Sequence, residues 1–348
     1  MPKIKTVLLS YGMSGKVFHA PFLNFHPGFE LVGCWERSKK LIQETYPNVK
    51  SYDTLEEILT DNTIDLVIVN TPIDTHFEFA KKALLAGKNI VVEKAFTTTV
   101  AEAVELKSIG ERQNKKIAVF HNRRWDSDFK TVKKIINEGW LGAINESEIH
   151  FDRYKPALST KPHKELPTLG NGALKDLGPH IIDQALVLFG WPDKLFADIR
   201  ITRIDSLIDD WFDIVLYYPT IRVRLKTGYL VREPLPAYIF HGAKGSFIKT
   251  RSDVQEADLT AGKNPGETNW GFDKDNGLLH TEINGEVIRK TFETLPGNYF
   301  DFYEALFQSL TENKPMPVSV DDGIAVIQII ESAEASSHSG ESISLRKI

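Results

Sequence analysis

The first 120 residues alternate short apolar runs with segments of helical length, and this alternation limits the possible folds more than any other feature of the chain. Parallel strands joined by helices produce such a pattern, because each helix carries the chain back across the sheet to the start of the next strand. The runs are nearly all apolar, as strands buried on both faces must be. We therefore predict a doubly wound, nucleotide-binding domain. Its strands are expected at 5–9, 30–35, 66–70, 89–92 and 116–120, and its helices at 16–24, 39–46, 75–86 and 100–113.

After about residue 122 the strand-like segments become longer and alternate in polarity, as in Ile221–Lys226, where apolar and basic residues take turns. This alternation places one face of each strand in solvent, which is typical of an antiparallel sheet with helices on one side. We therefore predict an α/β protein with a doubly wound domain, residues 1–122, and a second α/β domain with a large open, mostly antiparallel sheet, residues 123–348. The expected strands lie near 144–151, 195–203, 212–218, 221–226, 236–241 and 285–292, and the expected helices near 126–138, 178–189, 299–312 and 321–335.

The composition excludes several classes of protein. The chain has 348 residues with 42 Lys and Arg against 47 Asp and Glu, a net charge of −5, and no basic block that would bind nucleic-acid phosphates. It has a single cysteine and no cluster of cysteine or histidine with zinc spacing, so we expect neither a disulfide scaffold nor a metal. The N-terminus lacks a signal-peptide pattern and no apolar run approaches ~20 residues, so we expect a cytoplasmic protein without a membrane span.

A glycine turn, Leu9–Pro21, separates the first expected strand from the first helix. Gly12 and Gly15 stand where a dinucleotide site needs glycines, because the backbone there approaches the pyrophosphate at the helix N-terminus. Ser10 occupies the position of the first glycine of that pattern. The sequence therefore predicts cofactor binding at this turn, with a turn that holds no ligand as the alternative.

The second strand is followed by Glu36, Arg37 and Ser38, roughly twenty residues beyond the turn, where the adenosine ribose is recognised. Glu36 favours NAD, because a carboxylate accepts a hydrogen bond from the ribose 2′-hydroxyl. Arg37 favours NADP, because its guanidinium pairs with a 2′-phosphate, with Ser38 as a supporting donor. For Glu36 or Arg37 taken alone, the alternative to cofactor binding is an exposed charged residue at the start of a helix. We predict NADP, and NAD stays open.

Polar residues follow the two strands expected near the centre of the sheet. Residues 70–76 follow the first of these strands, and Lys94 follows the second. The carboxyl ends of parallel strands line the ligand crevice, so Lys94 is expected to point at the cofactor. In the second domain, Asp176 and His180 have the i, i+4 spacing that places two side chains on one side of a helix. We expect Asp176 to be the helix N-cap, with Pro179 in the first turn. Asp176 and His180 together are an acid/base candidate.

Together these residues resemble the glucose-fructose oxidoreductase / inositol dehydrogenase (Gfo/Idh/MocA) family over essentially the whole chain. The shared motifs, in the family's order and spacing, are the glycine turn with Val-Phe-His-Ala-Pro, Thr71-Pro72 with His76, Glu93-Lys94, His121-Asn-Arg-Arg-Trp125 and Asp176-Leu-Gly-Pro-His180. Within the family, the chain is most similar to the NADP-dependent scyllo-inositol 2-dehydrogenase subgroup, through segments such as Arg153–Pro156 and His241–Lys249.

The resemblance implies a Rossmann domain followed by an α/β domain that carries the substrate and often the oligomer interface. The family's catalytic lysine, aspartate and histidine fall on Lys94, Asp176 and His180. Its substrate-side arginine falls on Arg123. Ala95 stands where the family usually has a proline that commonly forms a cis bond after this lysine, and a cis bond before alanine costs ~3 kcal/mol.

The predicted site includes residues with less specific signals. Tyr154 is a candidate to hydrogen-bond a substrate hydroxyl, with packing as the alternative. Arg124 is expected in an inter-domain salt bridge, and Asp183 is expected to support the site from outside it. The predicted cofactor-binding residues are Gly12, Met13, Ser14, Gly15, Val17, Glu36, Arg37, Ser38, Asn70, Thr71, Pro72, His76, Glu93, Lys94 and Asn122, and the predicted substrate-binding residues are Arg123, Tyr154, Asp176 and His180.

We predict reversible hydride transfer between nicotinamide C4 and a carbon that carries a hydroxyl group in a cyclitol or sugar, such as scyllo-inositol. One assignment makes His180 the base and Lys94 the group that stabilises the alkoxide, and the other makes Lys94 the acid/base. A non-catalytic NADP-responsive regulator and an NAD-dependent glycosidase of the same fold stay open as alternatives.

The polar pocket, expected between the crevice and the second sheet, suits a polyhydroxylated ring. The sheet face turned away from it is expected to pair subunits in a homodimer or homotetramer.

Overall fold

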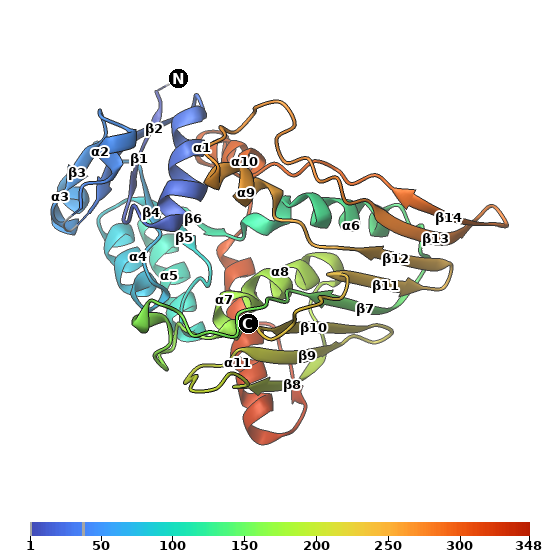
Figure 1. Ribbon diagram of the computed structural model, residues 1–348. Coiled ribbons are helices and arrows are strands. Elements are labelled where there is room, and N and C mark those ends of the chain that lie inside the picture. Colours follow the sequence, from blue (N-terminus) through green and yellow to red (C-terminus); the bar gives the residue numbers. More distant parts are fainter. Residues whose placement is uncertain (1, 37–38) are drawn as a thin grey trace. The chain divides into compact units, whose positions relative to one another are not determined.

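The computed structural model describes residues 2–36 and 39–348, and the chain forms two compact units (Figure 1). The later part of the chain contributes to both units, and helix α11 (Val320–Ser339) has residues in each. The first unit contains Met1–Asn122, Gln255–Trp270 and Asn298–Ile327, and the second contains Arg123–Val254, Gly271–Gly297 and Gln328–Ile348.

The first unit contains a parallel sheet of six strands. These are β1 (Ile4–Leu8), β2 (Phe29–Trp35), β3 (Lys50–Tyr52), β4 (Leu66–Val69), β5 (Asn89–Glu93) and β6 (Ile117–Phe120). Their order is β3-β2-β1-β4-β5-β6, so the direction of winding reverses between β1 and β4. In doubly wound sheets, ligands bind at the carboxyl ends of the strands beside this reversal. The predicted doubly wound sheet is confirmed, although the apolar pattern does not predict β3, which has only 3 residues and one of them buried.

Helices Leu55–Thr60 and Val100–Gln113 of the first unit each begin with a capping box. Thr99 and Glu102 form a capping box at the start of the longest helix of the Rossmann segment, each side chain accepting the backbone N–H of the other residue. The helix expected at 16–24 forms as a π-helical turn, Gly15–His19, that continues into a short α-helix. The helices are α1 (Ala20–Phe25), α2 (Ile42–Thr45), α3 (Leu55–Thr60), α4 (His76–Leu85), α5 (Val100–Gln113), α9 (Val254–Thr260), of which Val254 belongs to the second unit, and α10 (Phe300–Glu312).

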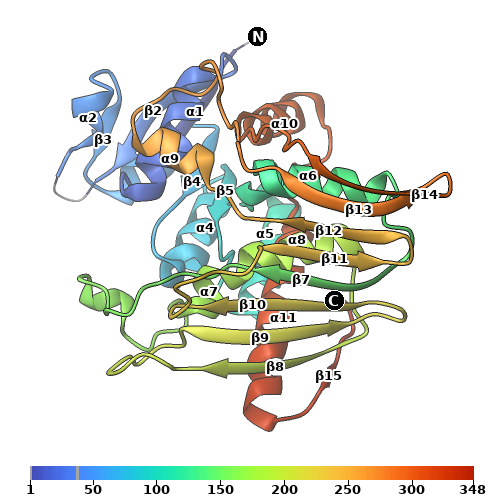
Figure 2. The ribbon, with the colours of Figure 1, turned by 45° about the vertical axis from the view of Figure 1, so that its right-hand side comes forward.

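The second unit contains a mixed sheet of nine strands (Figure 2). These are β7 (Ile144–His150), β8 (Lys194–Arg200), β9 (Trp211–Tyr217), β10 (Arg222–Gly228), β11 (Tyr238–Gly242), β12 (Gly245–Lys249), β13 (Gly277–Ile283), β14 (Glu286–Phe292) and β15 (Ile343–Ser344). Their order is β14-β13-β12-β11-β7-β10-β9-β8-β15, and only β7 and β10 pair in parallel. The predicted mostly antiparallel sheet is confirmed. Strands β12 and β13 were not predicted, because they begin with glycine and therefore give a weak strand signal.

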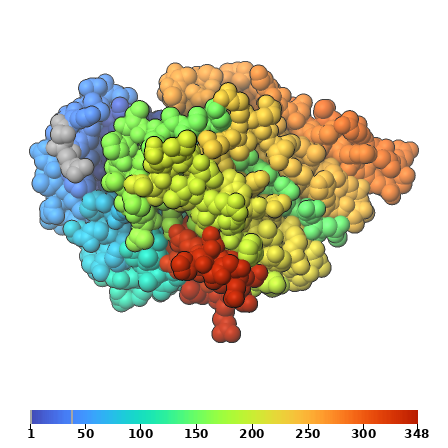
Figure 3. Space-filling model, turned by 60° about the horizontal axis from the view of Figure 1, so that its bottom comes forward, coloured from blue at the N-terminus to red at the C-terminus, as the bar shows by residue number. Residues whose placement is uncertain are grey.

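Helices cover one face of this sheet, as Figure 2 shows for α8 and α11. In β9, Phe212, Ile214 and Leu216 are buried while the residues between them are half-buried, as the alternating pattern predicts. Ser336 of α11 accepts the backbone N–H of Ala197 in β8 at 3.0 Å. The C-terminal end, red in Figure 3, lies at the surface. The helices of this unit are α6 (Ser127–Asn137), α7 (Ala173–Asp176), α8 (Gly178–Phe189) and the second part of α11.

Among the described residues, no helix combines the length and the apolar character that crossing a bilayer requires.

Candidate active site

The glycine turn after β1 is bonded to the loop after β4. Asn70, the residue after β4, donates from Nδ2 to the carbonyl oxygen of Ser10 at 2.8 Å. Gly15 lies against the same carbonyl: a Cβ added there would be 2.3 Å from the Ser10 oxygen and 3.0 Å from Asn70 Nδ2. The turn requires glycine at this position, because a side chain would displace the groups that join the two loops.

Ser10, the departure from the glycine pattern, takes part in the turn through its hydroxyl group. The hydroxyl oxygen accepts the backbone N–H of Gly12 at 3.1 Å, and the Gly12 carbonyl accepts the N–H of Lys16 at 3.0 Å. A local side-chain bond of this kind stabilises a turn that glycine would leave freer. The other predicted cofactor residues of the segment, Met13, Ser14 and Val17, lie in the turn and in its π-helical continuation.

Asn70 carries a buried polar atom that fits a ligand at the strand reversal. The residue is 6% exposed, and its Oδ1 has no hydrogen-bond partner among the described residues. A buried amide oxygen without a partner costs free energy. Because this oxygen lies beside the glycine turn, at the point where doubly wound sheets bind ligands, the residues present fit a dinucleotide that offers a donor here.

His76 ties the loop after β4 to the loop after β5. Its imidazole has no exposed surface, with Nδ1 2.9 Å from the carbonyl oxygen of Ala95 and Nε2 2.8 Å from that of Thr71. Burial lowers the pKa of His76, and the bonds to the carbonyl groups act in the opposite direction. Thr71 also bonds the hydroxyl of Thr75, in the short turn that follows Pro72. His76 therefore holds two loops together, and its part in cofactor binding stays a prediction.

Glu93 and Lys94 stand at the carboxyl end of β5. Lys94 is half-buried, and the peptide bond between Lys94 and Ala95 is cis. The Glu93 carboxylate accepts the backbone N–H of Lys94 at 3.2 Å, and its other oxygen lies 3.0 Å from Nε2 of His19. Burial acts to raise the pKa of Glu93, but the hydrogen bond and charge of His19, together with the charges of Lys94 and His76, outweigh it, so the pKa is lowered. Glu93 is thus a buried, ionised group in contact with the Lys94 backbone.

The carboxylate of Glu36, the residue that favours NAD, accepts hydrogen bonds from backbone N–H groups of this chain. It is 8% exposed, and its two carboxylate oxygens accept the backbone N–H groups of Leu41 at 2.8 Å and Ile42 at 3.0 Å. A carboxylate at this place satisfies the free N–H groups at the start of α2. Arg37 and Ser38, the residues that favour NADP, lie outside the described residues.

Asp176 is not the N-cap of the helix that carries His180, so this prediction is wrong. Asp176 is the last residue of α7, and α8 begins at Gly178 after Leu177. Pro179 explains the break, because it has no N–H with which to extend α7 and is well placed in the first turn of a new helix. Asp176 is exposed, whereas His180 is 6% exposed.

The second unit brings Arg123 and His180 to the same aromatic ring. The Phe151 ring lies 5.8 Å from the His180 ring and 5.2 Å from the Arg123 guanidinium, measured between centres. Arg123 is buried and donates to the carboxylates of Asp126 at 3.1 Å and Asp253 at 2.7 Å. Two carboxylates therefore fix the direction of the guanidinium. Asn122, which precedes Arg123, is also buried and ends the first segment of the first unit.

Tyr154 and Arg124 both have partners inside the second unit. Tyr154 is 44% exposed, and its hydroxyl accepts a hydrogen bond from Arg232. Arg124 donates from Nε and Nη2 to the two carboxylate oxygens of Asp183, at 2.8 and 2.6 Å. This pair therefore lies within the second unit, to which both residues belong, and not between the two domains as expected.

Asp209 anchors α7, which carries Asp176, and we expect it to make stability depend on pH. Its carboxylate accepts the N–H of Leu174 at 2.7 Å, and burial raises its pKa from 3.8 to about 6. Because the folded protein then binds more protons than the unfolded chain between these values, stability falls as the pH rises through this window. Asp209→Asn removes this loss. Relative to the natural protein, its free energy of unfolding should be about 2–3 kcal/mol higher at pH 8 and nearly the same at pH 4. Its Tm should therefore rise at pH 8 and change little at pH 4.

Asp210 supplies the control with the opposite sign. Burial acts to raise its pKa, but bonds from Thr202 and Arg203 outweigh burial and lower it. Its stabilising effect is present above its unfolded pKa and is lost as the pH falls. Asp210→Asn should therefore destabilise the protein more at pH 8 than at about pH 3, which lies below the unfolded pKa of 3.8, measured by thermal unfolding. A Tm difference for Asp209→Asn that is the same at pH 8 and pH 4 would contradict the prediction.

His19, to which no sequence pattern assigns a role, lies beside Glu93 in the structure. His19 has no exposed surface, and its Nδ1 lies 2.9 Å from the hydroxyl oxygen of Tyr303. The histidine belongs to the motif that follows the glycine turn, but 284 residues separate it from the tyrosine. No spacing in the sequence connects residues so far apart.

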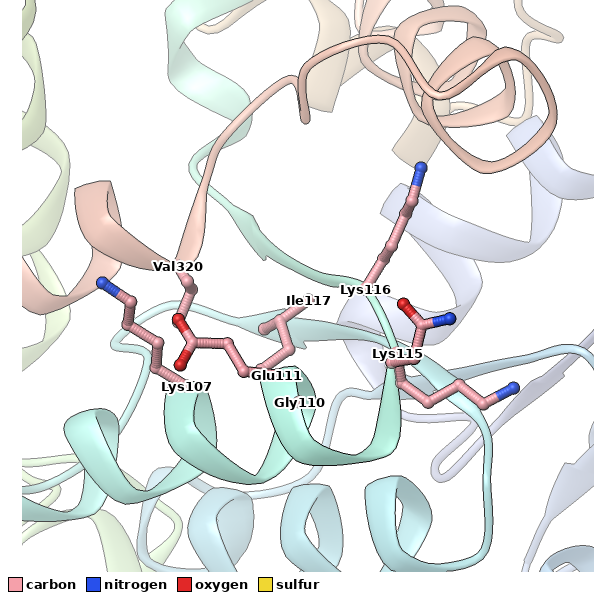
Figure 4. Close-up of a pocket in the computed structure, with 8 residues that line it drawn as sticks. Lys107, Gly110, Glu111, Lys115, Lys116, Ile117 and Val320 are labelled. Atoms are coloured by element: carbon pink, nitrogen blue, oxygen red, sulfur yellow. The ribbon is translucent and has the colours of Figure 1, made fainter.

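A hollow on the first unit lies away from these residues (Figure 4). It is found where α5 ends and β6 begins, at the amino end of that strand. Since ligands of doubly wound sheets bind at the carboxyl ends, we assign this hollow no part in cofactor binding. It is lined by Lys107, Gly110, Glu111, Asn114, Lys115, Lys116, Ile117 and Val320.

The strand order and the glycine turn define a dinucleotide-binding domain of the Rossmann type, followed in the chain by an α/β domain with an open sheet. Comparison with known protein families agrees: residues 4–121 match "Oxidoreductase family, NAD-binding Rossmann fold", and residues 133–345 match "Oxidoreductase family, C-terminal alpha/beta domain". The chain belongs to the Gfo/Idh/MocA family of oxidoreductases, which confirms the resemblance drawn from the motifs.

Relatives are similar along almost the whole chain. The scyllo-inositol 2-dehydrogenase (NADP(+)) IolW of Bacillus subtilis is 36% identical, over 98% of this chain and 96% of its own. The uncharacterized oxidoreductase YdgJ of Escherichia coli K12 is 38% identical, over 94% of each chain. Among solved structures, yvaA from Bacillus subtilis has a TM-score of 0.94 at 36% identity over 99% of both chains. An inferred oxidoreductase from Bacteroides fragilis has a TM-score of 0.91 at 42% identity over 99% of this chain and 100% of its own.

Proposed function

We propose that the protein is an NAD(P)-dependent dehydrogenase that oxidises a secondary hydroxyl group of a cyclitol or sugar to a ketone, and catalyses the reverse reaction. The observation that carries the proposal is the place of Lys94, a half-buried lysine at the carboxyl end of β5 in a dinucleotide-binding sheet. A cation there suits a reaction in which an oxygen atom becomes negatively charged. The similarity to a scyllo-inositol 2-dehydrogenase supports the substrate class.

The reaction removes a hydride from carbon and a proton from the hydroxyl oxygen of the alcohol. When bound, the nicotinamide group accepts or returns the hydride at C4. In one assignment, His180 takes the proton and Lys94 stabilises the negative charge on oxygen. In the other, Lys94 itself takes the proton. Asp176 is exposed and ionisable, so it is suited to accept hydrogen bonds from the hydroxyl groups of a polyol.

For the cofactor we propose NADP. Glu36, the residue that would accept the 2′-hydroxyl of NAD, already accepts two backbone N–H groups at the start of α2. Its carboxylate therefore has a structural task, which weakens the argument for NAD. The relative named for NADP(+) supports the same choice. The glycine turn and Asn70 fit the dinucleotide in either case.

Arg37→Ala should weaken the binding of NADP far more than that of NAD. Loss of a charge-assisted bond to the 2′-phosphate costs ~1.5 to 3 kcal/mol, and NAD carries no such phosphate. The test is a titration of both reduced cofactors by fluorescence. Equal weakening of the two would refute the assignment of Arg37.

A panel of inositols, aldoses and apolar alcohols, each with NADP and with NAD, tests the proposed function through the absorbance of reduced nicotinamide. We expect net reduction of NADP with an inositol or a sugar. Apolar alcohols should react poorly, because they leave the polar groups of the site unpaired, at ~1 to 3 kcal/mol each. A glycosidase would release an aglycone without net reduction, and a regulator would bind NADP without turnover. Turnover of apolar alcohols alone would refute the substrate class.

For the assembly, we propose a homodimer or homotetramer that forms through the face of the nine-stranded sheet left open by its helices. Half-buried apolar residues on this face, among them Phe196, Val215, Tyr217 and Ile248, would be covered by a second copy of the sheet. Light scattering at micromolar concentration should give at least twice the mass of one chain. A monomer would refute the assembly and leave the reaction untouched.

A further inference from the structure

A row of buried polar groups in the first unit reaches Lys94 from the π-helical turn. The hydroxyl of Tyr303, a fully buried residue of α10, donates its single proton to the carbonyl oxygen of Phe18. Tyr303 can then only accept from Nδ1 of His19, at 2.9 Å. On its other side, His19 presents Nε2 to Glu93 at 3.0 Å, and Glu93 accepts the Lys94 N–H at 3.2 Å.

The hydrogen-bond donors along this row explain why a carboxylate stands at position 93. Two N–H groups, Nε2 of His19 and the backbone amide of Lys94, point at the two oxygens of Glu93. A carboxylate is acceptor-only and satisfies both, whereas a glutamine would turn its amide hydrogens toward one of these donors. The lowered pKa of Glu93 agrees with an ionised group at this buried place.

We propose that His19 and Glu93 are positioning residues for Lys94: their buried pair fixes the backbone at Lys94 and thereby the direction of its side chain. This inference rests on the proposed dehydrogenase function. On the far side of Lys94, His76 lies 2.9 Å from the carbonyl oxygen of Ala95, so the segment is held on both sides. A displacement of about 1 Å at a reacting group can reduce turnover about 100-fold, which makes such support consequential.

Two replacements of His19 separate positioning from general stability. Glutamine keeps an N–H donor long enough to reach Glu93, whereas asparagine is too short to reach it and keeps only a donor toward Tyr303. We expect His19→Asn to lower kcat about 10- to 100-fold, with the KM for the alcohol and the dissociation constant of NADPH changed by only a few-fold. His19→Gln should retain most of the activity that the asparagine variant loses.

His26 provides the matched control. It is also buried, and its Nε2 lies 3.0 Å from a carboxylate, that of Glu304. Glu304 belongs to α10 and not to the strand that leads to Lys94. We expect His26→Asn to lower the Tm to a similar extent as His19→Asn and to leave kcat unchanged. Equal losses of kcat in the two asparagine variants would overturn the proposal.

A readout without substrate keeps this test separate from that of the proposed function. Hydrogen exchange, followed by mass spectrometry, reports on the peptide that covers 93–96. We expect faster exchange in His19→Asn than in the natural protein, and unchanged exchange in His26→Asn. Unchanged exchange in His19→Asn would overturn the positioning role, even if the panel finds the substrate. Faster exchange would support it even if no polyol or sugar reacts. If His19→Asn does not fold, Tyr303→Phe, which removes the acceptor for Nδ1, takes its place.

Discussion

Lys94→Ala is expected to lower kcat by about 100- to 10,000-fold while the dissociation constant of NADP changes by only a few-fold. The reason is that the Lys94 ammonium group interacts most strongly with the substrate oxygen in the transition state, where negative charge develops on that oxygen. His180→Ala should lower kcat to a similar extent, because the imidazole takes the proton from the hydroxyl group in the first assignment. Steady-state kinetics with the best alcohol of the panel measure kcat, and a titration of NADP followed by protein fluorescence measures the dissociation constant.

Lys82→Ala is the control for this experiment. Lys82 lies on α4 of the same unit, is 44% exposed at its side chain and pairs with Glu78 at the surface. Its loss removes the same charge without touching the end of β5, so kcat should not change. Full activity of Lys94→Ala would contradict the role of the lysine in both assignments and leave His180 alone as the candidate base.

Gly15→Ala is expected to raise the dissociation constant of NADP by about 5- to 150-fold. The added Cβ would lie 2.3 Å from the carbonyl oxygen of Ser10, so the backbone of the turn has to move, at a cost of about 1–3 kcal/mol. The movement also breaks the bond between Ser10 and Asn70, which holds the glycine turn to the loop after β4. Fluorescence titration gives the affinity, and thermal unfolding gives the accompanying loss of stability.

Gly139→Ala is the matched replacement in the second unit. Gly139 has a φ of +70°, and no atom lies within 4 Å of the added Cβ, so the change costs backbone strain of about 1 kcal/mol without a collision. We expect a lower Tm with normal affinity for NADP. If Gly15→Ala also binds NADP normally, the glycine turn does not form the cofactor site.

Local patterns in the sequence predicted most elements closely. The helix expected at 100–113 is α5, Val100–Gln113, because Thr99 and Glu102 mark its start and Asn114, with a φ of 50°, ends it. The failures have local causes as well. The glycines that open β12 and β13 weaken their strand signal, and Pro179 divides the helix expected to join Asp176 to His180.

For the candidate site, the sequence located the segments and the structure decided what their side chains contact. The loops after β1, β4 and β5 were predictable, because the carboxyl ends of parallel strands share one edge. The capping role of Glu36 depends on where α2 begins, and α2 is a single turn with a weak pattern. The bidentate pair of Arg124 with Asp183 depends on which faces of η3 (Asn122–Trp125) and α8 meet, and charge alone does not choose a partner.

By itself, the sequence determined the doubly wound sheet, the open second sheet and the glycine turn, because periodicity, capping and turn residues act between near neighbours along the chain. The family followed from the resemblance of its motifs. Only the tertiary structure decided that His19 meets Tyr303 across 284 residues, that Glu93 joins this pair to Lys94, and that His76 faces two carbonyl groups. Such contacts depend on how buried surfaces come together, and a buried donor or acceptor takes whichever partner packing brings within reach.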